Sequence, residues 1–118
     1  MPKNDDLMRV NDVIARFCQD VVSEPLCFFS EADLQGILFA KLLMEFPEQI
    51  ETSCSRGPDS KGKYKTGLVH REYGAGEGRR IDISIFDPKD VANIDEAGLK
   101  TGGEYIKPRF AIELGTEK

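Results

Sequence analysis

The chain has 118 residues, with 16 Lys and Arg against 21 Asp and Glu and a formal net charge of -5. This charge argues against a protein that coats nucleic acid or anionic membrane by bulk attraction, and the length suits a single domain over residues 1–118. Three widely spaced cysteines indicate neither a disulfide framework nor a zinc site. No segment resembles a signal peptide or approaches the ~20 apolar residues of a membrane span, so we expect a cytoplasmic protein without a membrane partner.

Two helices are predicted in the first part of the chain. The first covers residues 4–22, where apolar residues recur at helical spacing and no chemical motif stands out. The second covers about 30–46, begins at the N-cap Ser30 and is apolar nearly all round, so we expect it to lie against a sheet. Its few polar residues, among them Glu31 and Lys41, are therefore informative, although Glu31 has the alternative role of complementing the helix dipole.

Four strands are predicted, near residues 50–54, 66–73, 79–87 and 109–115. The fold class is thus α/β (α+β), with helices packed on a mixed β-sheet. Residues 55–65 are rich in glycine, proline and lysine and are predicted to be a loop. Within this loop Lys61 and Lys63 are candidates for contact with a phosphate backbone, and the alternative is a solvated hairpin tip.

Two carboxylates interrupt strands that otherwise have the composition of buried elements. In a strand the side chains alternate between faces, so Asp82 points away from a face of isoleucines, and Glu113 has the same relation to its own apolar face. Those faces consist of Ile81, Ile83 and Ile85 in the first strand and Phe110, Ile112 and Leu114 in the second. A carboxylate in such a place is costly unless it is paired, hydrogen-bonded or bound to a metal. Two of them on neighbouring strands indicate a divalent-cation site.

The order of these features resembles the PD-(D/E)XK nuclease superfamily, which has the restriction-endonuclease-like fold. The resemblance covers about residues 26–118 and rests on an early Glu31 in a helix, Asp82 in the second strand of a hairpin, and Glu113 in the following strand. It implies an αβββαβ core, of which this chain would hold the αβββ portion and be incomplete at the C-terminus. It also implies Mg²⁺ or Mn²⁺ bound by Asp82, Glu113 and the main-chain carbonyl of Leu114.

One element of the superfamily motif is missing. Position 115, where the motif has a lysine that positions the attacking water, is glycine. Some members carry this lysine on another element, and Lys41 is the internal candidate. Lys118 is a second candidate, although it lies too far along the chain to share the face of Glu113 in a straight strand. Glu31 matches an acidic residue on the first core helix of many members and would hold a ligand water or a second ion.

Three further residues are candidates for binding nucleic acid. His70 extends the site if the register of its strand places it on the polar face, and Arg79 and Arg80 would contact the phosphate backbone. Each has a structural alternative. A lone histidine is more often a surface or packing residue, and two arginines beside a hairpin turn are often only solvated.

The resemblance therefore implies a Mg²⁺-dependent, endonuclease-like phosphodiesterase that acts on nucleic acid, with DNA as the expected partner. A homodimer or a missing C-terminal segment would complete the fold. Two alternatives stay open. The chain is either a catalytically degenerate module of the same fold that binds nucleic acid or protein, or an unrelated α+β protein whose carboxylates form ion pairs with Arg79 or Lys107.

Overall fold

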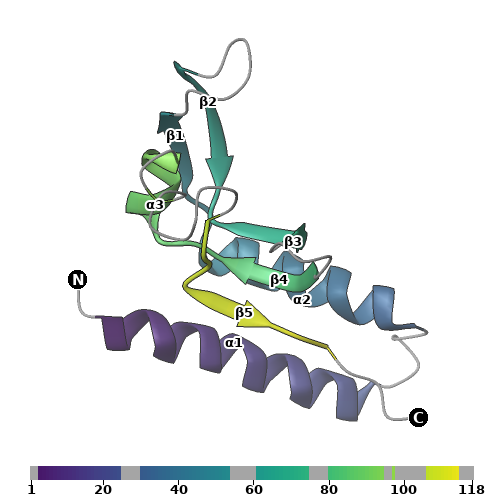
Figure 1. Ribbon diagram of the computed structural model, residues 1–118. Helices are drawn as coiled ribbons and strands as arrows, with labels where there is room; N and C mark the ends of the chain where they lie inside the picture. The colour runs from purple at the N-terminus through teal and green to yellow at the C-terminus, as the bar shows by residue number, and fades with distance from the viewer. Residues whose placement is uncertain are drawn as a thin grey trace. The chain divides into compact units, whose positions relative to one another are not determined.

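The computed structural model describes residues 3–24, 30–53, 61–74, 80–94, 97 and 106–114. These residues form an α+β structure in which helices are combined with two small antiparallel sheets (Figure 1). The chain divides into two compact units. A helical unit holds the described residues from Lys3 to Glu45 together with Leu114, and a sheet unit holds those from Phe46 to Glu113.

Two helices that contact each other make up the helical unit, α1 (Lys3–Ser23) and α2 (Glu31–Glu45). The helices bury apolar residues three, four or seven positions apart, which places these residues on one face of each helix. They are Val10, Val13 and Phe17 in α1 and Leu38 and Leu42 in α2. Both predicted helices are confirmed to within one residue at each end.

The start of α2 has the N-cap that the sequence predicts. The Ser30 hydroxyl accepts a hydrogen bond from the Asp33 amide at 3.2 Å, and the Ser30 carbonyl accepts one from the Leu34 amide at 3.1 Å. These contacts satisfy amides that have no partner within the first turn of a helix. The helix therefore begins where its sequence provides a capping side chain.

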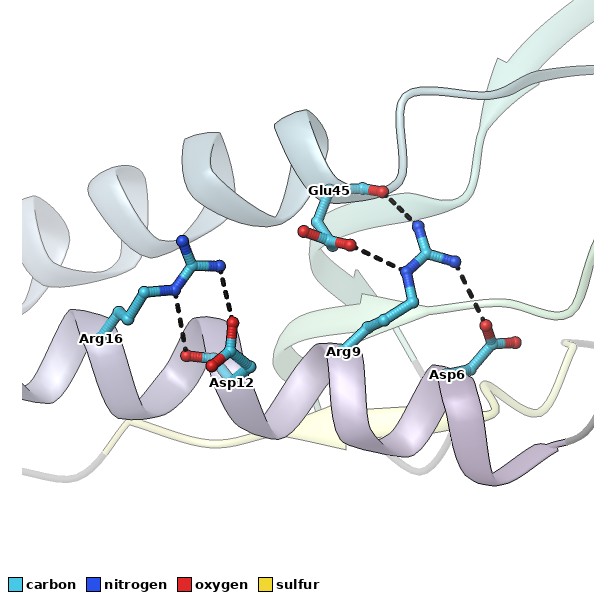
Figure 2. A network of polar contacts seen from close by, with 5 residues as sticks. All are labelled: Asp6, Arg9, Asp12, Arg16 and Glu45. Atoms are coloured by element: carbon cyan, nitrogen blue, oxygen red, sulfur yellow. Dashed lines mark hydrogen bonds and ion pairs between the residues drawn. The ribbon is translucent and has the colours of Figure 1, made fainter.

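The end of α2 is held by an arginine of the other helix (Figure 2). Arg9 of α1 donates from Nε to the Glu45 carboxylate at 2.8 Å and from Nη2 to the Glu45 carbonyl at 2.6 Å, and a third contact joins Nη1 to Asp6 at 3.3 Å. The last carbonyls of a helix have no partner within the helix, and a cation at this end also suits the helix dipole. Arg9 thus caps α2 and links it to α1.

Replacing Arg9 by alanine is expected to lower the free energy of unfolding of the helical unit by about 1 kcal/mol, since the contacts are charge-assisted but partly solvated. The matched control is Arg16→Ala. Arg16 is paired with Asp12 of its own helix at 3.0 Å and is more exposed, so this change should cost less than about 0.5 kcal/mol. Urea unfolding followed by far-ultraviolet circular dichroism measures both. Equal losses would show that Arg9 adds nothing beyond a surface ion pair.

Two antiparallel sheets form the sheet unit. In the first, β1 (Gln49–Ser53) pairs with β2 (Lys61–Gly67), and in the second the order is β3-β4-β5, with β3 (Val69–Gly74), β4 (Arg80–Ile85) and β5 (Phe110–Ile112). The hairpin expected between the second and third predicted strands is confirmed as the β3–β4 pair. Among the described strands β4 is central, and it has a neighbour on each side.

A short helix and a small apolar cluster complete the sheet unit. Helix α3 (Pro88–Ala92) begins where the Asp87 carboxylate accepts a hydrogen bond from the Lys89 amide at 2.9 Å, and Pro88 takes the first position, where no amide is needed. The buried cluster consists of Leu68, Phe86 and Val91, with Ile50, Tyr73 and Ile106 packed against it. This cluster joins both sheets to α3.

Two predictions about the strands are wrong. Residues 61–65, expected in a loop, belong to β2, because pairing with β1 overrides a local composition that favours a loop. The single mixed sheet is instead two sheets, and the described strands pair only antiparallel. The predicted strand at 66–73 is divided at Leu68, which is buried between β2 and β3. The packing of α1 and α2 on a sheet and the restriction-endonuclease-like core remain predictions.

Candidate metal centre

Asp82 lies in the central strand β4, between residues that face the other side of the sheet. Its neighbour Ile83 is 0% exposed, whereas Asp82 is half-buried and shares its face with Ser84 two residues further on. Alternation along β4 therefore gives one apolar face and one face that carries a carboxylate. The strand positions the Asp82 side chain at a partly solvated place on the sheet.

Glu113 follows directly after β5, the neighbour of β4. The last pair of the antiparallel ladder is Ile83 with Ile112, and the same register continued by one position would set Asp82 opposite Glu113. Opposed residues of an antiparallel pair project from the same face, with β-carbons about 4.5–5.5 Å apart. Glu113 is exposed, so the pair of carboxylates lies at the solvated edge of the described sheet. The register brings together the two residues on which the predicted site depends.

This pair suits a hard cation that retains most of its water. Mg²⁺ is usually held by one or two carboxylates and keeps several water ligands, whereas an all-protein cage needs more donors. Within the described ranges no three His, Cys, Asp or Glu side chains are grouped closely enough to hold a metal ion. Asp82 and Glu113 are hard oxygen donors of the type that Mg²⁺ or Mn²⁺ prefers.

Strand β3 lies on the other side of β4 and carries His70 and Glu72. His70 pairs with Ser84, which shares a face with Asp82, and Glu72 lies opposite Asp82, between the paired positions Arg71 and Tyr73. Glu72 has a backbone φ of 53°, which is uncommon for any residue except glycine. The register thus places His70 on the polar face, as the extended site requires.

His70 is nevertheless engaged in local packing. Its Nε2 lies 2.9 Å from the Gly67 carbonyl and 3.4 Å from the Thr66 hydroxyl, and its ring meets Phe86 edge-on at 5.4 Å. The short contact to a carbonyl requires a proton on Nε2. These contacts hold the ring against the cluster around Phe86, which favours the packing role over direct contact with a phosphate.

Three candidates belong to the helical unit. Glu31 is exposed in the first turn of α2, and the Lys41 ammonium forms an ion pair with the Asp20 carboxylate of α1 at 3.2 Å. Leu114, whose carbonyl is an implied ligand, directly follows Glu113 in sequence. The partner of Lys41 gives this lysine a structural role between two helices. The functional roles of all three residues stay predictions.

The other candidates for nucleic-acid contact are partly outside the described residues. Arg80 is exposed at the start of β4 and lies 3.7 Å from the Glu72 carboxylate. Arg79 and Lys118 fall outside the described ranges, and Lys61 and Lys63 are placed only as backbone positions of β2. Of the two candidate arginines, Arg80 is therefore the one whose side-chain contacts are described.

A cavity in the sheet unit was not predicted from the sequence. It has a volume of about 310 Å³ and its described lining is almost entirely apolar. Its walls include Thr52, Thr66, His70, Phe86, Ile94 and Ile106. These residues come from four of the described stretches of the chain, and none belongs to a recognisable motif. Only the pairing of the strands brings them together, so no sequence signal identifies the cavity.

Two buried hydroxyls have no hydrogen-bond partner among the described residues, Thr52 Oγ1 and Ser84 Oγ. Ser84 is 0% exposed in the centre of β4. A buried polar group without a partner costs about 1–3 kcal/mol, so Ser84→Ala is expected to leave stability unchanged or raise it by about 1 kcal/mol. Urea unfolding followed by tyrosine fluorescence tests this, with Ser23→Ala at the exposed end of α1 as control. A clear loss of stability would show that the hydroxyl has a partner.

Comparison of the chain with models of protein families, with curated proteins and with solved structures gives no match. Within the described part of the chain, no helix has the length and apolar character needed to cross a membrane.

Proposed function

We propose that this chain is a divalent-metal-dependent nuclease domain that hydrolyses phosphodiester bonds in nucleic acid, with DNA as the expected substrate. The observation that carries the proposal is the register of β4 and β5. The ladder ends at the pair Ile83–Ile112, and its continuation by one position would bring Asp82 of β4 next to Glu113, the exposed residue that follows β5. The three strands β3, β4 and β5 follow one another in the sheet, with the Asp in the middle and the Glu after the third, in the order that the superfamily resemblance implies.

Asp82 and Glu113 would hold Mg²⁺ or Mn²⁺ together, and the Leu114 carbonyl would add a neutral oxygen. Bound there, the ion would act as a Lewis acid on the phosphate and lower the pKa of a bound water. The exposure of Glu113 leaves room for a polymeric substrate to approach. Arg80, exposed at the start of β4, provides a positive charge for a neighbouring phosphate.

The superfamily motif has a lysine at position 115 that positions the attacking water, and this chain has glycine there. Gly115 cannot fill this role, and Lys41 already forms an ion pair with Asp20. Lys118 and Lys41 are the lysines to test, since an amine near the site would orient the water. The glycine at position 115 also favours the second candidate function, a degenerate module that binds nucleic acid without cutting it.

Two measurements test the proposal. The first is cleavage of plasmid and of labelled single- and double-stranded oligonucleotides with Mg²⁺, Mn²⁺ or EDTA, in which we expect metal-dependent cutting. The second is paramagnetic broadening by Mn²⁺, which should affect the amides of Ile83 and Ile112 first, with or without activity, and should be lost in Asp82→Asn. Tight binding of DNA without cleavage and without Mn²⁺ broadening would contradict the nuclease function and support the degenerate module that binds nucleic acid.

A further inference from the structure

The cavity of the sheet unit has walls suited to a flat, largely apolar group. The rings of His70 and Phe86 form part of its wall, and the side chains of Ile94 and Ile106 form another part. Its volume of about 310 Å³ lies at the small end of ligand pockets. The described lining contains no carboxylate, ammonium or guanidinium group. A charged ligand or a bare sugar is therefore disfavoured, and an aromatic ring system is favoured.

Polar edges of the same cavity indicate a ligand that forms hydrogen bonds as well. Thr52 lines the cavity and is 8% exposed, yet its hydroxyl has no partner among the described residues. Rotation about the Cα–Cβ bond exchanges the hydroxyl and methyl groups of a threonine between neighbouring rotamers. A ligand with a donor or acceptor on its edge would give Thr52 the missing partner, and an aliphatic ligand would not. The Thr66 hydroxyl is a second polar group on the wall.

The cavity adjoins strand β4, which carries Asp82, through residues of β3 and through Phe86, which directly follows β4. His70 lines the cavity and pairs with Ser84, two residues from Asp82 along β4. Two residues of a strand span roughly 7 Å. This separation is comparable to the distance between the phosphate and the base of one nucleotide. The two features are thus spaced for one ligand to reach both.

We propose that this cavity receives a nucleobase of the substrate strand, next to the phosphate that Asp82 and Glu113 would hold. The proposal rests on the proposed nuclease function and adds a base-binding subsite to it. The aromatic and aliphatic walls contact the faces of the base, and the hydroxyls of Thr52 and Thr66 contact its edge. Base contacts of this kind would make cleavage depend on the nucleotide beside the scissile phosphate.

The experiment measures binding of free nucleosides to the full chain in EDTA, so that no metal site contributes. Adenosine, guanosine, cytidine, uridine and thymidine are titrated separately while amide chemical shifts are followed by NMR. At least one nucleoside should give saturable shifts at the amides of Thr52, Thr66 and His70. Cyclohexanol, a smaller aliphatic alcohol without an aromatic ring, is the reference ligand and should bind more weakly.

Two variants separate a base-binding role from simple packing. Thr52→Val should weaken nucleoside binding by about tenfold, the effect of one lost hydrogen bond, while the melting temperature of the free protein rises. Ile94→Phe fills the cavity and should abolish binding, whereas the same substitution at half-buried Ile37 of α2 should leave binding unchanged. A merely structural role for Thr52 would change only the melting temperature.

The outcomes keep this inference separate from the nuclease proposal. Absence of saturable shifts, equal binding of cyclohexanol, or an unchanged affinity in Thr52→Val would each overturn the base-binding subsite, even if the chain cleaves DNA. The chain could also bind nucleosides, with weaker binding in the Thr52 and Ile94 variants, and cleave nothing. This result would support the base-binding subsite and contradict the nuclease function.

Discussion

Asp82→Asn is expected to lower metal-dependent cleavage by about a thousandfold, because a lost metal ligand removes several kcal/mol of transition-state stabilisation and each 1.36 kcal/mol is tenfold in rate. Asparagine keeps the size and the hydrogen-bonding capacity of the side chain, so the fold should be unaffected. Single-turnover cleavage of a labelled oligonucleotide at saturating protein measures the effect. Mn²⁺ broadening at Ile83 should disappear in the same variant.

The matched control is Asp90→Asn, which neutralises another half-buried carboxylate of the sheet unit, on α3. This variant should retain its activity to within about twofold, as expected for a surface change away from the site. Glu113→Gln should resemble Asp82→Asn, and the double variant should lose little more than either single change, because the two ligands act as one unit. Wild-type cleavage no faster than that of Asp82→Asn would end the nuclease proposal.

Ile83→Ala is expected to destabilise the sheet unit by about 3 kcal/mol, the loss typical of a fully buried isoleucine replaced by alanine. Ile83 is 0% exposed and pairs with Arg71 on one side and Ile112 on the other. The expected loss therefore combines lost burial with a cavity in the middle strand. Because Tyr73 lies in β3 and its ring packs against Phe86, tyrosine fluorescence during urea unfolding reports on the sheet unit.

Met44→Ala serves as the comparison, since Met44 is 82% exposed on α2. Its change in the free energy of unfolding should lie within about 0.5 kcal/mol of zero. A similar small effect for Ile83→Ala would mean that β4 does not hold the apolar core of the sheet unit. The pairing of β4 with β5, and with it the register that aligns Asp82 with Glu113, would then lose its support.

The helices were the most predictable part of the fold. The apolar spacing of Val10, Val13 and Phe17 and the capping serine at position 30 are local signals, and local signals determine where a helix begins and which face it buries. The Arg9 cap at Glu45 could not be predicted, because it joins residues 36 positions apart. Contacts of that kind depend on how two helices pack.

The strands were less predictable, for the same physical reason. Residues 61–65 have the composition of a loop and become part of a strand only because β1 supplies hydrogen bonds. The bend at Leu68, which separates the two sheets, follows from burial of its side chain and leaves no mark in the alternation pattern. Strand propensity is weak compared with such tertiary contacts.

Of the candidate site, alternation predicted which side of its strand Asp82 occupies, but not which residue it faces. The register of β4 and β5 depends on long-range pairing, and only this register indicates that Glu113 would follow opposite Asp82. The structural contact of Lys41 with Asp20 was not predictable either, since the two residues lie on different helices. The cavity around Thr52 was missed for the same reason.

The alignment of Asp82 with Glu113 also has a consequence for the end of the β4–β5 ladder. Like charges directly across a ladder repel each other, and here the ladder stops at Ile112, one residue before Glu113. In the metal-free protein this repulsion favours fraying of the strand ends. If the proposed metal site exists, a divalent cation between the two carboxylates would remove this repulsion and allow the ladder to extend by one pair.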